Sequence, residues 1–225
     1  YDSKVTENSE LNSELTNEEV YADYKKVYLT FDDGPDTNIT HRVLDVLQKY
    51  EVPATFFVEG QYINEDTIPV MKRALSLGCN IENHSYSHGN MAEMDAEQIC
   101  KELQETDELI TSVTGRTPKF FRPPFISVSD TLFENVEKTF ICGFHAEDWV
   151  PEVSAKERVK RILEQAKNGG ITLLHDMEEN EQTVEALETI IPSLLADGYE
   201  FVTVEEIFRL MKVTPERGIV YSYVE

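Results

Sequence analysis

Apolar and polar positions follow two alternating rhythms from residue 27 onward. Short runs of β-branched and aromatic residues, typical of buried strands, precede segments whose apolar residues recur at helical spacing. Residues 27–31 and 40–50 form the first such pair, with Val43, Leu44 and Leu47 on one helical face. The further expected strands are 54–60, 79–83, 119–125, 141–150, 171–175 and 200–204. The further expected helices are 65–78, 95–115, 129–140, 154–170, 183–198 and 205–212.

This order predicts about seven strand–helix units with no linker between them. Such alternation implies an α/β fold with parallel strands and helices outside. The pattern leaves open a closed barrel or a doubly wound open sheet. Residues 1–24 differ, because they hold seven acids, one lysine and no glycine or proline. We expect an acidic tether or arm over 1–24, with a docked helix around 14–24 as the alternative, and one domain over 25–225.

Composition excludes two classes of function for the 225-residue chain. The formal net charge is −23, from 43 acidic and 20 basic residues, which argues against nucleic acid as a partner because phosphate binding needs clustered Lys and Arg. No run of 18 apolar residues is present, so we expect no transmembrane segment. The chain begins at Tyr1 rather than Met, and we expect that a signal or anchor has been removed upstream. The sequence leaves the oligomeric state open.

Unusual polar residues gather where the expected strands end. The carboxyl ends of parallel strands meet at one edge of the sheet, which is where α/β folds place their sites. The residues at these ends are Asp32, Asp33, His84, His88, Arg122, Asp148, Trp149 and His175. The adjacent acids Asp32 and Asp33 precede Gly34 and Pro35, so a plain turn is the alternative to a site.

The segment HSYSH, residues 84–88, has the residue types of a metal site. Two histidines four positions apart, with a carboxylate from elsewhere, can supply the three protein ligands of an open catalytic centre. The alternative is a solvated polar turn, and the spacing alone does not decide between them. Imidazole and carboxylate suit Zn²⁺ first, with Co²⁺, Ni²⁺, Mn²⁺ and Fe²⁺ as alternatives.

Five motifs in order carry a family resemblance. TFDDGP, HSYSH, RPPF, DW and LLH resemble the motifs of the polysaccharide deacetylases, the NodB homology domains of carbohydrate esterase family four. The resemblance covers most of residues 27–212. It implies a distorted (β/α) barrel and a polysaccharide deacetylase catalytic domain over 25–225. It also implies a metal-dependent hydrolase of amide bonds, which removes N-acetyl groups from an amino-sugar polymer.

The resemblance divides the work between the two adjacent aspartates. Asp33 corresponds to the metal ligand that acts with His84 and His88. Asp32 corresponds to the general base that takes a proton from the attacking water. Arg122 corresponds to the arginine that keeps this base ionised and oriented.

The same resemblance implies an acid and a substrate pocket. His175 corresponds to the general acid that protonates the departing amine, with a hydrogen-bonded core histidine as the alternative. The backbone N–H of Phe125, beside Pro123, corresponds to an oxyanion donor. Trp149 and Leu173 correspond to the wall around the acetyl methyl group.

One motif departs from the family. Its fourth motif usually reads Asp-x-x-Asp-Trp, and the resemblance assigns its first Asp to tuning the acid histidine. Here His145 stands at that position, and an imidazole does not raise the pKa of His175 as a carboxylate does. Strand alternation places residues 145, 147 and 149 on one face. We therefore expect Glu147 to supply the missing charge.

The family leaves several acetylated glycans open as substrates. Peptidoglycan N-acetylglucosamine is our first expectation, followed by chitooligosaccharides and O-acetyl xylan. An extracellular or cell-envelope location follows from these polymers. The alternative is a catalytically impaired carbohydrate-binding domain of the same fold, which His145 keeps open.

Overall fold

The computed structural model describes residues 25–224, in which parallel strands form one curved sheet. Along the sheet the strand order is β10-β6-β5-β4-β3-β2-β8-β1-β9, and β7 pairs with β8. The expectation of an acidic tether at 1–24 lies outside the described residues. The hydrogen-bonded path has two ends, β10 and β9, and every pairing between named strands is parallel.

The strands are shorter and more numerous than the sequence pattern suggests. Their bounds are β1 Lys25–Tyr28, β2 Thr30–Gly34, β3 Thr55–Val58, β4 Asn80–Asn83, β5 Phe120–Phe121, β6 Thr139–Ile141, β7 Phe144–His145, β8 Gly170–His175, β9 Tyr199–Phe201 and β10 Val220–Tyr221. Leu29 separates β1 from β2, so the first expected strand contributes two strands to the sheet. The predicted parallel α/β class is confirmed, with more than the expected seven strands.

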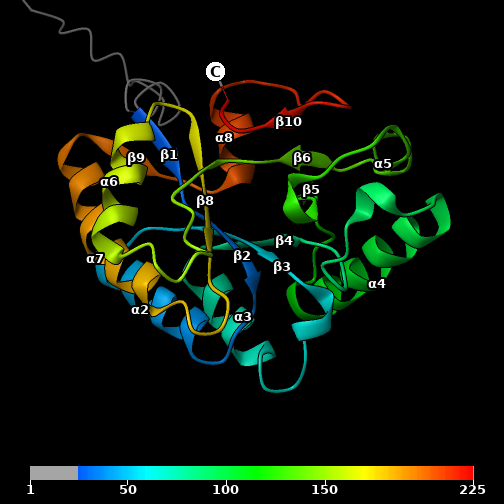
Figure 1. Cartoon of the computed structure of the whole chain (residues 1–225), viewed down its shortest axis with the longest axis horizontal. Coiled ribbons are helices and arrows are strands. Elements are labelled where there is room, and N and C mark those ends of the chain that lie inside the picture. The colour runs from blue at the N-terminus through cyan, green and yellow to red at the C-terminus, as the bar shows by residue number, and fades with distance from the viewer. Residues whose placement is uncertain (1–24, 225) are drawn as a thin grey trace, which may run out of the picture.

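Helices follow most strands and cover the outside of the sheet (Figure 1). Their bounds are α2 Ile39–Tyr50, α3 Ile68–Ser76, α4 Ala96–Thr114, α5 Asp130–Asn135, α6 Ala155–Gln165, α7 Glu181–Ala196 and α8 Val204–Leu210. Three single 3₁₀ turns lie at Gly60–Tyr62, Met91–Glu93 and Pro124–Ile126. Gly115 ends α4 with a left-handed φ of 73°, as the sequence predicts. No helix within residues 25–224 is long and apolar enough to cross a membrane.

Several expected elements are wrong in extent: the strand expected over 119–125 is only Phe120–Phe121, the helix expected over 154–170 ends at Gln165, and the strand expected over 200–204 ends at Phe201. Two further differences lie between residues 129 and 150. The helix expected over 129–140 ends at Asn135, and Thr139 and Phe140 belong to β6. The β-branched and aromatic run Thr139–Ile141 favours a strand over a further helical turn. The strand expected over 141–150 continues only through Phe144 and His145, after which the chain turns.

The sheet buries side chains on both faces. On one face, Phe56 of β3 packs with Phe31 of β2 and the outer helices. The Phe31 and Phe56 rings stack with centroids 5.3 Å apart. Phe57, the neighbour of Phe56, points the other way, into a second cluster with Tyr28 and Phe120. Burial on both faces is what a parallel sheet requires. The same packing holds the carboxyl ends of the strands in place, and these ends carry the candidate site residues.

The helix α7 allows a matched test of this core. Ile190 is fully buried, whereas Leu195 on the same helix is 40% exposed. We expect Ile190→Ala to lower the free energy of unfolding by about 2–5 kcal/mol, because it leaves a cavity in the core. Leu195→Ala should change it by about 0.5 kcal/mol or less. Urea denaturation measures both, and equal losses would contradict the packing described.

Candidate active site

A β-bulge at the end of β2 turns two adjacent aspartates toward one cavity. Asp32 is in register with Phe57 of β3 and His175 of β8, and the register shifts before Gly34 pairs with Val58. Asp33 is the extra residue and has a φ of 70°. On a regular strand, neighbouring side chains would point to opposite faces. The bulge removes that alternation, so the turn expected at this position also shapes the site.

The two histidines of HSYSH are brought to Asp33 by a loop after β4. His84 Nε2 lies 3.2 Å and His88 Nε2 lies 3.4 Å from Asp33 Oδ1. One donor atom from each of the three residues lies within 4.8 Å of the others. Within residues 25–224, Asp33 Oδ1 is buried without a hydrogen-bond donor to satisfy it. Two imidazole nitrogens and an unsatisfied carboxylate oxygen fit a divalent cation with an open coordination position.

The protonation states at this cluster have clear physical causes. Burial alone would raise the pKa of Asp33, but interactions with His84, His175 and His88 lower it to about 2. Burial and the neighbouring His84 lower the pKa of His88. Burial opposes charge on His84 as well, but Asp32 and Asp33 raise its pKa. An ionised carboxylate and a neutral imidazole are the forms that bind metals.

The HSYSH loop is held from behind by α4. Glu102 accepts hydrogen bonds from the backbone N–H groups of Tyr86 and Ser87, at 2.9 and 2.8 Å. The Ser85 hydroxyl accepts one from the N–H of His88. Sequence reasoning missed Glu102, because nothing in the helical pattern marks which exposed-face acid meets a loop.

Arg122 follows β5 and contacts both Asp32 and His84. Its side chain is fully buried, and its Nη1 donates to Asp32 Oδ1 at 2.5 Å and to Thr30 Oγ1 at 2.7 Å. The guanidinium also lies over the Phe57 ring, 4.3 Å from its centroid. The backbone carbonyl of Arg122 lies 2.7 Å from His84 Nδ1, which directs Nε2 to the cavity. The structure therefore places Arg122 against both Asp32 and His84.

His175 has a carboxylate partner, and it is Asp148. His175 Nδ1 lies 2.8 Å from Asp148 Oδ1, and the backbone N–H of His175 donates to Asp148 Oδ2 at 2.8 Å. Burial disfavours charge on the imidazole, but Asp148 raises the pKa of His175 to about 9. The Asp148 carboxylate is itself buried, yet contact with His175 and Thr183 lowers its pKa.

The expectation that Glu147 tunes His175 is corrected by this geometry. Glu147 is exposed and pairs with Arg161 of α6 at 2.5 Å. The expectation assumed strand alternation through residue 149, but β7 ends at His145 and Glu147 has a φ of 56°. The His145 ring packs on Trp149, with the two ring centroids 4.9 Å apart. The signal that could have found Asp148 was its place beside Trp149 in the DW motif.

A cavity of about 660 Å³ collects the expected catalytic and metal-binding side chains except Arg122, which is buried behind Asp32. It is lined by Asp32, Asp33, His84, His88, Pro123, Phe125, Ile126, Cys142, Gly143, His145, Trp149, Leu173 and His175. Phe125 is 68% exposed and its ring edge meets His88. Trp149 is 43% exposed and meets His175 in the same way, whereas Leu173 is buried at the cavity floor. All four expected substrate-binding residues therefore line one cavity.

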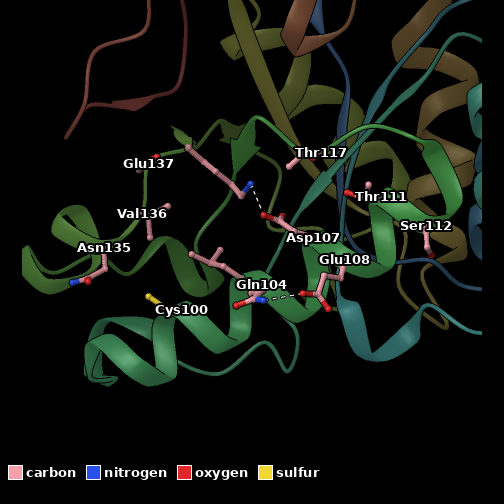
Figure 2. A pocket seen from close by; sticks show the side chains of 12 residues that line it. Cys100, Gln104, Asp107, Glu108, Thr111, Ser112, Thr117, Asn135, Val136 and Glu137 are labelled. Atoms are coloured by element: carbon pink, nitrogen blue, oxygen red, sulfur yellow. Dashed lines mark hydrogen bonds and ion pairs between the residues drawn. The ribbon is translucent and has the colours of Figure 1, made fainter.

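A second hollow, of about 710 Å³, lies away from these residues between α4 and the α5–β6 segment (Figure 2). Its polar side chains are largely paired with one another. Lys138 Nζ lies 2.7 Å from Asp107, and Gln104 donates to Glu108 at 2.8 Å. Neither a histidine nor a residue from the motifs lines it. We assign the chemistry to the first cavity.

Comparison with known proteins agrees with this geometry. The family model described as polysaccharide deacetylase matches residues 19–146. The chain belongs to this family. The resemblance seen in the motifs is thereby confirmed, as is the NodB-type α/β fold.

Two curated relatives match most of this chain and a smaller part of themselves. A bifunctional xylanase/deacetylase of Pseudobutyrivibrio xylanivorans is 46% identical over 191 residues, which are 85% of this chain and 32% of the relative. The peptidoglycan-N-acetylglucosamine deacetylase PgdA of Listeria monocytogenes is 32% identical over 185 residues, 82% of this chain and 39% of the relative. The chain thus spans between about a third and two fifths of these relatives.

A solved structure resembles the whole described domain. It is a family 4 acetyl xylan esterase from Clostridium thermocellum in complex with a cobalt ion. Its sequence is 45% identical, and the TM-score is 0.86 over 89% of this chain and 99% of that chain. The match shows that this chain shares the fold of that structure over most of its length.

The pair of acids 147 and 148 provides a test of the tuning carboxylate. We expect Asp148→Asn to move the basic limb of the pH–rate profile to lower pH, because the raised pKa of His175 depends on that negative charge. The protonated acid is then lost earlier as pH rises. Glu147→Gln should leave the profile near wild type. Acetate release measured across pH decides, and a shift in Glu147→Gln alone would restore the earlier expectation.

Proposed function

We propose that this domain hydrolyses acetyl groups on a polysaccharide with the help of a divalent cation, most readily O-acetyl groups of xylan. The observation that carries the proposal is that Asp32 and His175 line one cavity together with Asp33, His84 and His88, which could hold a cation. The relatives at 45–46% identity are named for xylan or xylanase, against 32% for the peptidoglycan enzyme. The sequence expectation ranked peptidoglycan N-acetylglucosamine first, chitooligosaccharides second and O-acetyl xylan third. We now rank xylan first and peptidoglycan second.

The chain's own residues divide the hydrolysis into two proton transfers. Asp33, His84 and His88 would hold a divalent cation, which as a Lewis acid would acidify water and polarise the acyl carbonyl. Asp32, kept ionised by Arg122, accepts the proton of the attacking water. His175 Nε2 donates a proton to the sugar oxygen or nitrogen as its bond to the acyl carbon breaks. The products are acetate and a free hydroxyl or amine.

The remaining cavity residues hold the acyl group. The backbone N–H of Phe125 is the proposed donor to the developing oxyanion. Trp149 and Leu173 present apolar surface to the acetyl methyl group, and Pro123 lines the same wall. Zn²⁺ remains our first choice of metal on ligand chemistry, with Co²⁺ next because a relative binds it.

The alternative of an impaired carbohydrate-binding domain loses its physical basis. It depended on His145 replacing the acid that tunes His175. Asp148 lies 2.8 Å from His175 Nδ1, so the carboxylate is supplied by another residue. Acetylated polymers of this kind lie outside the cell or in its envelope, and we place the protein there.

The adjacent aspartates give the sharpest test of this division of labour. Asp33→Asn should lose bound metal, because it removes the carboxylate between the two imidazoles. Asp32→Asn should retain metal and lose turnover by roughly 10²–10⁴-fold, because the base is removed. Metal content after dialysis is measured by emission spectrometry, alongside acetate release. Full activity of Asp32→Asn would overturn the mechanism.

Substrate class is tested by acetate release from acetylated xylan, peptidoglycan and an acetylated chitooligosaccharide. We expect the highest kcat/KM on xylan and loss of release with a chelator, restored by Zn²⁺ or Co²⁺. Faster release from peptidoglycan would return it to first place. Bound metal without release from any of the three glycans would favour the binding domain.

A further inference from the structure

A buried arginine lies behind the Asp148–His175 pair. Arg158 of α6 is 2% exposed, although arginine side chains are rarely buried without partners. It lies on the inner face of α6, between the buried Ala155 and Ile162. Its Nε donates to the carbonyl of Val153 at 2.8 Å. Its Nη2 lies 3.4 Å from the carbonyl of Val150, and its Nη1 faces α7 and the loop before it.

Arg158 contacts two side chains that both reach Asp148. Its Nη1 donates to Asn180 Oδ1 and, at 2.8 Å, to Thr183 Oγ1. Thr183 Oγ1 in turn lies 2.8 Å from Asp148 Oδ2, and Asn180 Nδ2 lies 3.3 Å from the same oxygen. The Asn180 amide also donates to the backbone carbonyl of His175 at 2.8 Å.

The chemistry of the guanidinium decides the direction of these hydrogen bonds. Arginine is a donor at every nitrogen and never an acceptor. Asn180 must therefore turn its oxygen to Arg158, which leaves its NH₂ group for Asp148 and His175. Thr183 must accept from Arg158, so its single hydroxyl proton goes to Asp148. Asp148 and the His175 carbonyl are acceptors too, so they require the same donor directions. An apolar residue at 158 would remove the donor that anchors the Asn180 oxygen and the Thr183 hydroxyl, and both side chains could then move away from Asp148.

This arrangement fills the acceptor capacity of Asp148 on the side away from the imidazole. Oδ2 accepts hydrogen bonds from the Thr183 hydroxyl, the Asn180 amide and the backbone N–H of His175. Oδ1 faces the ring nitrogen Nδ1 of His175. An ionised carboxylate can only accept, so Nδ1 carries a proton. The other ring nitrogen, Nε2, then faces the cavity.

We propose that Arg158 is a positioning residue for the general acid: by anchoring the side chains of Asn180 and Thr183, it holds Asp148 and through it the His175 ring. This inference depends on the proposed function, because it assigns the role to the acid of that reaction. Arg158 does not line the cavity and does not contact the substrate in this proposal. It acts through a chain of hydrogen bonds that starts on α6 and ends at Nε2 of His175.

A comparison of leaving groups separates positioning from general stability. A sugar hydroxyl or amine leaves well only if His175 protonates it, whereas 4-nitrophenolate is a stable anion and leaves without a proton. We expect Arg158→Met to lower kcat on acetylated xylan by about tenfold to a hundredfold, since small misplacements of a catalytic group cost this much. On 4-nitrophenyl acetate its kcat should stay within about twofold of wild type.

Arg161 offers a matched control on the same helix. It lies almost one turn further along, is part-exposed and pairs with Glu147 and Glu157 rather than with the Asp148 network. Arg161→Met should leave kcat on both substrates near wild type. Equal losses on the two substrates in Arg158→Met would overturn the inference, as would a loss in Arg161→Met of the same pattern.

A spectroscopic readout keeps the test independent of turnover. The Nδ1 proton of His175, shared with Asp148, should give a downfield proton resonance in the wild type and in Arg161→Met. We expect it to be lost or shifted upfield in Arg158→Met, and its persistence unchanged would count against the inference. If the wild type shows this resonance but hydrolyses neither acetylated xylan nor 4-nitrophenyl acetate, the proposed function is overturned. The change of the resonance in Arg158→Met then still tests the positioning role of Arg158.

Thr183→Val provides a second variant if Arg158→Met shows no cooperative unfolding. It removes the hydroxyl donor to Asp148 and keeps the shape of the side chain. The same selective loss on the glycan is expected, with 4-nitrophenyl acetate turnover retained. Wild-type behaviour of Thr183→Val on both substrates would overturn the chain of contacts proposed here.

Discussion

The site depends on one irregularity of the sheet, the bulge at Asp33. Two consecutive carboxylates can serve different partners in one cavity only if strand alternation is interrupted between them. A left-handed φ of 70° at a non-glycine residue costs of order 1–3 kcal/mol, although aspartate tolerates this region better than most residues. Gly34 follows at a point where a Cβ would meet the Asp176 carboxylate. The Asp176 carboxylate thus packs against the bulge at Gly34, and the surrounding fold imposes the geometry of the bulge.

Two histidines in this cavity receive different roles from what lies behind each ring. His84 Nδ1 faces the neutral carbonyl of Arg122, which fixes the ring without greatly stabilising a positive charge. His175 Nδ1 faces an ionised carboxylate, which favours the imidazolium. The first arrangement suits a metal ligand and the second suits a proton donor. Arg122 connects the two halves, because its backbone orients His84 while its side chain holds Asp32.

The sequence predicts much of this site because strand ends are visible in the hydrophobic pattern. Asp33, His84, Arg122 and His175 all follow short apolar runs, and a parallel sheet brings such ends together. Glu147 was misplaced because the pattern does not show where β7 stops. Thr183 lies 35 positions from Asp148 on a helix whose apolar face gives no sign of the contact. Arg158 did leave a signal, since it interrupts the apolar face formed by Ala155 and Ile162.

Charge balance explains why so acidic a chain can concentrate carboxylates in its interior. The negative charge of Asp32 is offset by Arg122. The charge of Asp148 is offset by His175 through direct contact, and by Arg158 through the Asn180 amide and the Thr183 hydroxyl. Asp33 has only imidazoles beside it among the described residues within ion-pair range. Burial, together with Asp33 and Asp32, raises the pKa of the nearby Asp176 to about 7. A divalent cation held by Asp33, His84 and His88 would offset the field of both Asp33 and the nearby Asp32.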